Sequence, residues 1–279
     1  MKHARESLPR SLRSFLRKVY YFPRDVRNRI SGKRQDLVPP TRMVTTIGGG
    51  DFEAVGREFL PLFRDLGKLQ PSHAVLDVGC GVGRMAVPLT SYLDARARYE
   101  GFDITPEEIA WCRKHITPRF PNFNFQLSDI YNRMYNPTSP VKASAYRFPY
   151  GNGEFDFVFL TSVFTHLLPE DLTHYFSEIV RVMKPGGRCF ITYFLLNAES
   201  LRLLAEGRST QDFRFQLEGC KTTDQKTPES AVAYEEAFIA GLYHGHGLKI
   251  ETPVSYGSWC GRERYVSYQD IIIAEKRNP

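Results

Sequence analysis

The chain has 279 residues, 42% of them hydrophobic and 13% aromatic, which is enough for one large domain with a substantial buried core. This composition excludes a chain that is disordered throughout, and no apolar run approaches the roughly 20 residues of a membrane-spanning helix. Five cysteines are scattered without a Cys-x-x-Cys pair, which excludes a zinc or redox motif of that type and is typical of a reducing compartment.

The formal net charge of +6 is concentrated at one end of the chain. Residues 1–40 contain eleven Lys or Arg and three acidic residues, whereas the other 239 residues carry a net charge of −2. Apolar side chains recur there at the spacing of one helical face, at Leu8, Leu12, Phe15, Leu16 and Val19. We therefore expect residues 1–40 to form a basic helical arm that packs on the body, contacts an anionic membrane surface or binds phosphates. Pro39-Pro40 marks its boundary.

Helices and strands alternate from Arg42 onwards. Asp51 is a suitable N-cap for a helix with an apolar stripe from Phe52 to Leu66 and a kink at Pro61. Strands are predicted at 74–78, 98–102, 124–127, 157–160 and 189–194. Helices are predicted to begin near residue 84 and at Thr105-Pro106, where Glu108 completes a capping box, and a third helix is predicted around 172–183. Strands apolar on both faces, separated by helices, indicate a parallel sheet covered on both sides.

Beyond residue 194 the alternation is looser. A helix is predicted near 199–205, a polar stretch at 208–228, a helix near 230–243, and strands at about 248–254 and 265–274. We predict one doubly wound α/β domain, a three-layer α/β/α sandwich, over residues 41–279, with insertions near 131–146 and 197–246.

The most informative segment is a strand that ends in an acid and a glycine-rich turn. Asp77 is followed by Gly79, Cys80, Gly81 and Gly83. Residues without a Cβ let a ligand approach the backbone, and the N-terminus of the next helix favours a negative group. A dinucleotide fingerprint has its third glycine one residue later, and Asp77 would repel a pyrophosphate but suits a ligand with an ammonium group and a cationic sulfur. A nicotinamide-dependent dehydrogenase is therefore disfavoured.

Two more acids end the next two strands, each 26 residues after the last. Asp103 is placed to accept hydrogen bonds from both hydroxyls of a ribose. Asp129 is placed to bind an exocyclic amine while Ile130 packs on the ring. The alternative for both acids is that they only cap the helices that follow.

With these motifs the chain resembles the class I S-adenosylmethionine-dependent methyltransferases from about Asp51 to Phe194. The resemblance also includes Phe148–Val158 and Met183–Gly187. It implies a Rossmann-like, mostly parallel seven-stranded sheet whose last strand is antiparallel. It further implies that S-adenosylmethionine lies across the carboxyl ends of the strands. The cofactor contacts that it implies are Asp77, Gly79, Cys80, Gly81, Gly83, Asp103, Ile104, Asp129, Ile130 and Thr161.

The fourth strand is followed by a segment that departs from some relatives. It lacks the Asp/Asn-Pro-Pro-Tyr/Phe run of enzymes that methylate base amines or glutamine, and the carboxylate with which catechol-type enzymes hold magnesium. We therefore expect no metal. His166 follows this strand, and an imidazole with a pKa near 6.5 suits a general base for a hydroxyl acceptor. The alternative is that His166 packs on the cofactor or caps the next helix.

Segments that vary within the family must form the acceptor site. Tyr131 and Tyr135, in a long loop with Asn132 and Asn136, combine aromatic faces with amides as a polyhydroxylated acceptor requires. Trp259 and Arg262 come from the segment that joins the last two strands. Both segments can equally be ordinary loops held by aromatic side chains.

The leading hypothesis is methyl transfer from S-adenosylmethionine to the hydroxyl oxygen of a small-molecule or glycan-like acceptor. The alternatives are N-methylation, nucleic-acid methylation through the basic arm, and a binding protein without catalysis. The chain lacks a recognised nucleic-acid-binding module, so we do not expect a nucleic-acid partner. The sequence shows no secretory signal peptide, and we expect a cytoplasmic protein. The oligomeric state is left open.

Overall fold

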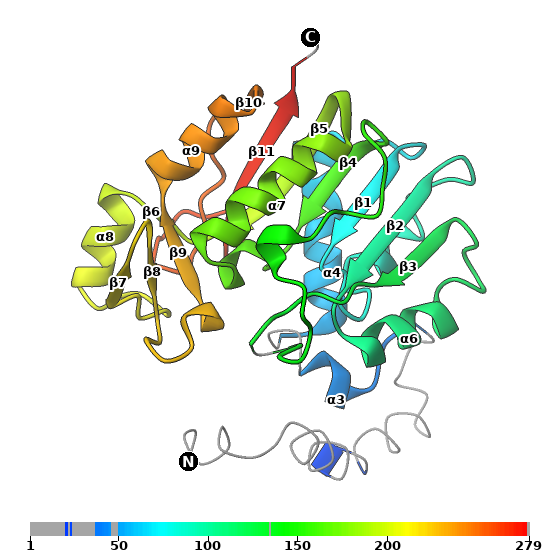
Figure 1. Cartoon of the computed structure of the whole chain (residues 1–279), viewed down its shortest axis with the longest axis horizontal. Coiled ribbons are helices and arrows are strands. Elements are labelled where there is room, and N and C mark those ends of the chain that lie inside the picture. The colour runs from blue at the N-terminus through cyan, green and yellow to red at the C-terminus, as the bar shows by residue number, and fades with distance from the viewer. Residues whose placement is uncertain (1–19, 22, 24–36, 46–49, 134, 278–279) are drawn as a thin grey trace.

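The computed structural model describes residues 20, 21, 23, 37–45, 50–133 and 135–277 (Figure 1). The helix predicted within residues 8–19 lies outside the described residues, as does most of the basic arm. A short helix, α3 (Thr41–Val44), follows the Pro39-Pro40 boundary. Among the described residues, no helix combines the length and apolar character needed to span a bilayer.

The central sheet has seven strands. They are β1 (Ala74–Val78), β2 (Arg98–Asp103), β3 (Phe123–Leu127), β4 (Phe155–Leu160), β5 (Met183–Tyr193), β10 (Leu248–Ile250) and β11 (Asp270–Lys276). Their order across the sheet is β10-β11-β5-β4-β1-β2-β3. The pairs within β1 to β5 are parallel, and β11 is antiparallel to both of its neighbours. The predicted mostly parallel sheet with an antiparallel last strand is confirmed.

Helices cover both faces of this sheet (Figure 1). One face carries α4 (Phe52–Pro61), α5 (Ala86–Leu89) and α6 (Pro106–His115), and the other carries α7 (Pro169–Val182) and α9 (Glu236–Gly245). Alternate residues of β4 feed the two cores: Phe157 and Phe159 pack with the α4 side, whereas Val158 and Leu160 pack with the α7 side. A strand that is buried on both faces therefore fixes the layers.

Two local predictions need correction at helix ends. Asp51 caps α4 as expected, with its Oδ1 accepting the Ala54 N–H at 2.8 Å. The chain does not simply kink at Pro61, because it continues as one π-helical segment, η1 (Leu62–Leu66). The capping box at Thr105 is wrong. The side chain of Thr105 caps nothing, and the N–H of Thr105 instead donates to Asp103 Oδ1 at 2.9 Å.

A second, four-stranded sheet follows the fifth strand of the first. It comprises β6 (Leu195–Leu196), β7 (Phe215–Leu217), β8 (Cys220–Thr222) and β9 (Val232–Glu235), in the order β6-β9-β8-β7, with α8 (Ala198–Ala205) beside it. The sequence predicts a polar stretch and a helix starting near Ser230 instead. Strands of two to four residues are too short to show an alternating pattern, which is why periodicity misses them.

Candidate active site

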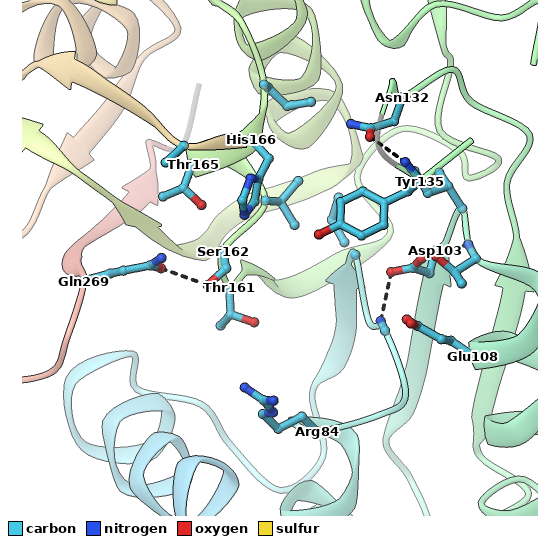
Figure 2. Close-up of a pocket in the computed structure, with 18 of the residues that line it drawn as sticks. Arg84, Asp103, Glu108, Asn132, Tyr135, Thr161, Ser162, Thr165, His166 and Gln269 are labelled. Carbon is cyan, nitrogen blue, oxygen red and sulfur yellow. Dashed lines mark hydrogen bonds between the residues drawn. The ribbon is translucent and has the colours of Figure 1, made fainter. Parts of the chain in front are cut away.

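A cavity of about 560 Å³ opens at the carboxyl ends of β1, β2 and β4 (Figure 2). Its volume lies in the usual range of small-molecule sites. The glycine turn after β1, the end of β2 and the start of α6 form one side. The turn after β4, residues 194, 211, 230 and 231 beside the second sheet, and residues 267–269 form the other. In parallel sheets this edge is where ligands bind.

The glycine turn forms the floor of the cavity. Gly79, Gly81 and Gly83 have φ angles of 80°, 52° and 78°, which favour glycine. Gly79 and Gly81 line the cavity, and a Cβ on Gly79 would collide with the Val163 side chain. Gly83 and Cys80 do not line it: Gly83 packs on Ile116, and Cys80 is buried behind the turn. The cavity therefore brings Gly79 and Gly81 to the site but not these two residues, whose cofactor contacts stay predictions.

Asp103 holds the glycine turn and faces the cavity. Its Oδ2 accepts the N–H of Gly81 at 2.9 Å, and its Oδ1 accepts that of Thr105 at 2.9 Å. Burial raises the pKa of Asp103, and these hydrogen bonds oppose the rise. The carboxylate has further lone pairs for ligand hydroxyls. Glu108, buried at the start of α6, lines the same end of the cavity. The sequence predicts only a helix cap there.

The side chain of Asp77 lies behind the turn rather than in the cavity. It is 1% exposed, and its Oδ2 accepts the hydroxyl of Tyr99 at 2.5 Å. Burial raises the pKa of Asp77 to about 8, against the opposing effect of that hydrogen bond. The predicted direct contact with an ammonium group needs correction, because the pleat of β1 turns this side chain towards β2.

Asp129, the acid that follows β3, stabilises a loop and does not face the cavity. Asp129 is exposed, does not line the cavity, and accepts the Asn136 side-chain amide at 3.0 Å. In this structure the carboxylate holds the loop that starts at Tyr131, and its contact with an exocyclic amine stays a prediction. Ile104 and Ile130 do line the cavity, as predicted.

The loop after β3 reaches over the cavity. Tyr131, Asn132 and Tyr135 all line it. The N–H of Tyr135 donates to Asn132 Oδ1 at 3.0 Å, and Figure 2 shows the Tyr135 hydroxyl directed into the cavity. The structure thus brings the two predicted tyrosines to the site.

The turn after β4 presents Thr161, Ser162 and His166 to the cavity. Ser162 has a φ of 60°, a left-handed conformation that is uncommon for a residue with a Cβ, and its N–H donates to Thr192 Oγ1 at 2.8 Å. Its hydroxyl donates to Gln269 Oε1 at 3.0 Å, which joins β4 to the segment before β11. Gln269 and Ser162 are site residues that the sequence does not single out.

The imidazole of His166 is fixed on one side. Its Nδ1 lies 2.8 Å from the carbonyl oxygen of Glu229. A carbonyl only accepts, so Nδ1 donates and the neutral ring keeps a lone pair on Nε2. Burial lowers the pKa of His166, and hydrogen bonds to the Glu229 and Ser230 backbone oppose the change. The ring is directed into the cavity (Figure 2).

Trp259 and Arg262 do not reach the cavity. The indole N–H of Trp259 donates to Asp270 Oδ2 at 2.7 Å. Arg262 forms ion pairs with Asp270 and Glu199 at 2.8 and 2.7 Å. Both side chains are buried and neither lines the cavity, so their predicted acceptor contacts need correction. Tyr268, from the same segment, lines it instead.

Comparison with known proteins identifies the region that supplies part of this cavity. Residues 76–191 match the family model described as "Methyltransferase domain". A sterol 24-C-methyltransferase of Schizosaccharomyces pombe is 28% identical over 119 residues, which are 43% of this chain and 27% of that protein. An O-methyltransferase of Penicillium expansum is 27% identical over 135 residues, 47% of this chain and 42% of that protein. The matches thus span less than half of each of these relatives.

The fold extends the likeness beyond the matched region. The structure of 1,6-didemethyltoxoflavin-N1-methyltransferase from Burkholderia thailandensis has a TM-score of 0.51 and 16% sequence identity. The alignment covers 98% of this chain and 92% of that chain, whose structure holds 1,6-didemethyltoxoflavin and S-adenosylhomocysteine. Residues 76–191 of the present chain are a methyltransferase domain, and the fold of the described chain is that of the class I S-adenosylmethionine-dependent methyltransferases.

Proposed function

We propose that the chain transfers the methyl group of S-adenosylmethionine to a hydroxyl oxygen of a small-molecule or glycan-like acceptor. The choice of oxygen as the acceptor atom rests on His166, whose imidazole is neutral and has a free lone pair on Nε2. A hydroxyl must lose its proton as the methyl group arrives, and a neutral imidazole with one nitrogen fixed on a carbonyl is suited to accept that proton.

The residues of the cavity fit the cofactor. Gly79 and Gly81 leave room beside the backbone, Asp103 offers lone pairs to ribose hydroxyls, and Ile104 and Ile130 provide apolar contact for a base. When bound, S-adenosylmethionine supplies a methyl group that its sulfonium has already activated. The protein's tasks are then to position the acceptor and to take up its proton.

The remaining wall of the cavity favours a neutral, hydroxylated acceptor. Gln211, Ser230 and Gln269 bring amides and a hydroxyl to it, and Tyr268 adds an aromatic face. The hydroxyl of Tyr268 is held by Thr210 and Gln211, at 2.9 and 2.8 Å. Aromatic faces stack on polyhydroxylated molecules, and amides beside them form hydrogen bonds with the hydroxyl groups. The name of the Penicillium relative is consistent with transfer to oxygen.

The reaction is tested with S-adenosylmethionine that carries ¹³C in its methyl group, offered together with a small-molecule extract and a panel of soluble phenols and sugars. We expect label in an O-methyl group, which NMR distinguishes from N-methyl and C-methyl groups. Label on nitrogen or carbon would contradict the choice of oxygen. Cofactor binding without any label transfer would indicate a binding protein.

His166→Ala tests the proton acceptor. We expect kcat to fall by about 100-fold or more, since general-base catalysis contributes on the order of 10²–10⁴, while the Kd for S-adenosylhomocysteine is unchanged. The wild-type rate should also fall in acid only below about pH 6.5, because the pKa of His166 is lowered. The matched control is His246→Ala, outside the cavity. Unchanged kcat in His166→Ala would end the assignment.

A further inference from the structure

Arg84 supplies the only guanidinium or ammonium group among the described residues that line the cavity. It directly follows the third glycine of the turn. Figure 2 shows its side chain directed into the space below Thr161, on the opposite side of the cavity from Tyr135.

The surroundings of Arg84 keep it in place and keep it charged. α4 packs directly on its backbone, because a Cβ on Gly56 would lie 2.8 Å from the Arg84 carbonyl oxygen. Burial lowers the pKa of Arg84, whereas the nearby carboxylates of Asp51 and Glu108 raise it. An arginine remains protonated at neutral pH under such shifts.

The position of Arg84 matches one end of the proposed cofactor. The end of the cavity with Asp103 and Ile130 suits the nucleoside. The cofactor must then extend past Gly79 and Gly81, and its amino-acid end approaches the side where Arg84 and α4 form the wall. That end carries one carboxylate. The other charged groups of the wall, Glu58, Asp103 and Glu108, would repel it.

We propose that Arg84 binds the α-carboxylate of the methionine portion of S-adenosylmethionine. This inference rests on the proposed function. A planar guanidinium can bind a carboxylate through two parallel hydrogen bonds, and a partly buried site strengthens such a pair. Arg84 then orients the amino-acid end while Asp103 orients the ribose, so that two points fix the sulfur between them.

The proposal predicts a selective loss of affinity. We compare S-adenosylhomocysteine with its decarboxylated analogue, 5′-deoxy-5′-(3-aminopropylthio)adenosine, by calorimetry on the full chain. The wild type should bind the decarboxylated compound about 10- to 100-fold more weakly, which is the usual effect of a hydrogen bond to a charged group. Arg84→Gln should bind S-adenosylhomocysteine more weakly by a similar factor, should bind the analogue as the wild type does, and should not distinguish the two compounds.

The controls separate this inference from the proposed function. Arg84→Lys keeps the charge without the planar geometry and should recover part of the affinity. Arg98→Gln removes an arginine that pairs with Glu154 at 2.6 Å outside the cavity, and should change neither Kd. Failure of the wild type to bind S-adenosylhomocysteine would refute the proposed function itself.

Three results would overturn the inference while the proposed function stands. The first is that Arg84→Gln binds S-adenosylhomocysteine as tightly as the wild type does. The second is that it binds both compounds more weakly by equal factors, which would assign Arg84 a structural role in the pocket. The third is that its Kd values are unchanged while the KM for an acidic acceptor rises, which would place the acceptor's anion on Arg84.

Discussion

At the scale of single residues, the three acids that end successive strands have three different roles. Asp103 lines the cavity, Asp77 is buried behind the glycine turn, and Asp129 holds a surface loop. The residue types and their spacing in the sequence are the same in each case. The direction in which each strand presents its last side chain makes the difference, and that direction depends on the twist and register of the sheet.

The buried carboxyl of Asp77 predicts a specific dependence of stability on pH. Its pKa is about 8 in the folded chain and near 3.8 when exposed, so the folded state holds a proton that the unfolded state releases between these values. Stability should therefore fall as pH rises through this window. In Asp77→Asn, whose amide can still accept the Tyr99 hydroxyl, this part of the decline should be absent.

Urea unfolding at about pH 5 and about pH 8 measures the effect. The difference in free energy of unfolding between the two pH values should be smaller in Asp77→Asn than in the wild type. Equal differences in the two proteins would show that Asp77 is ionised in the folded state.

At the scale of elements, a buried ionic group joins β11 to the start of the second sheet. Asp270, the first residue of β11, accepts the N–H of Leu195 at 2.8 Å and pairs with Arg262 at 2.8 Å. Both side chains are almost fully buried. In Asp270→Asn the buried Arg262 keeps only Glu199, whose side chain is half-exposed, as an ionic partner, and a buried charge that loses a buried partner is strongly destabilising.

Asp270→Asn should therefore lower the free energy of unfolding by about 3–5 kcal/mol. Urea denaturation measures this loss. The matched control is Glu251→Gln, which removes a half-exposed partner of Arg188 while Glu275 stays paired with that arginine, and should cost less than about 1 kcal/mol. Similar losses in the two variants would show that the buried group does not contribute more than a surface ion pair.

At the scale of the whole molecule, the cofactor-binding half of the fold is predictable from the sequence and the other half is not. β1 begins and ends at the predicted residues, and the parallel pairing of β1 to β5 agrees with the predicted alternation of strands and helices. The strands around Leu195, Phe215 and Cys220 have two or three residues each and form only through mutual pairing. Local pattern carries no signal for such strands, and so Gln211, Tyr268 and Gln269 were not predicted in the site.

The cavity draws its walls from segments far apart in the chain, so a ligand can bind only the folded state. Saturating S-adenosylhomocysteine at about 100 times its Kd should stabilise the chain by about 2.7 kcal/mol, equivalent to about 5–10 °C in Tm for a chain of this size. Differential scanning fluorimetry measures the shift, which should shrink in Asp103→Asn. A nicotinamide dinucleotide should give no shift. A shift with the dinucleotide alone would contradict the cofactor assignment.

The second sheet is divided between two apolar clusters, because Ala233 packs with Phe213 and Trp259 whereas Tyr234 belongs to the cluster that includes α7. Substitutions at Gln211, on the Phe213 side, should therefore leave the packing beneath the glycine turn intact. Under the proposed function, selection could thus change the acceptor side of the cavity without rebuilding the turn that would hold the donor, and an engineer could redesign that wall independently.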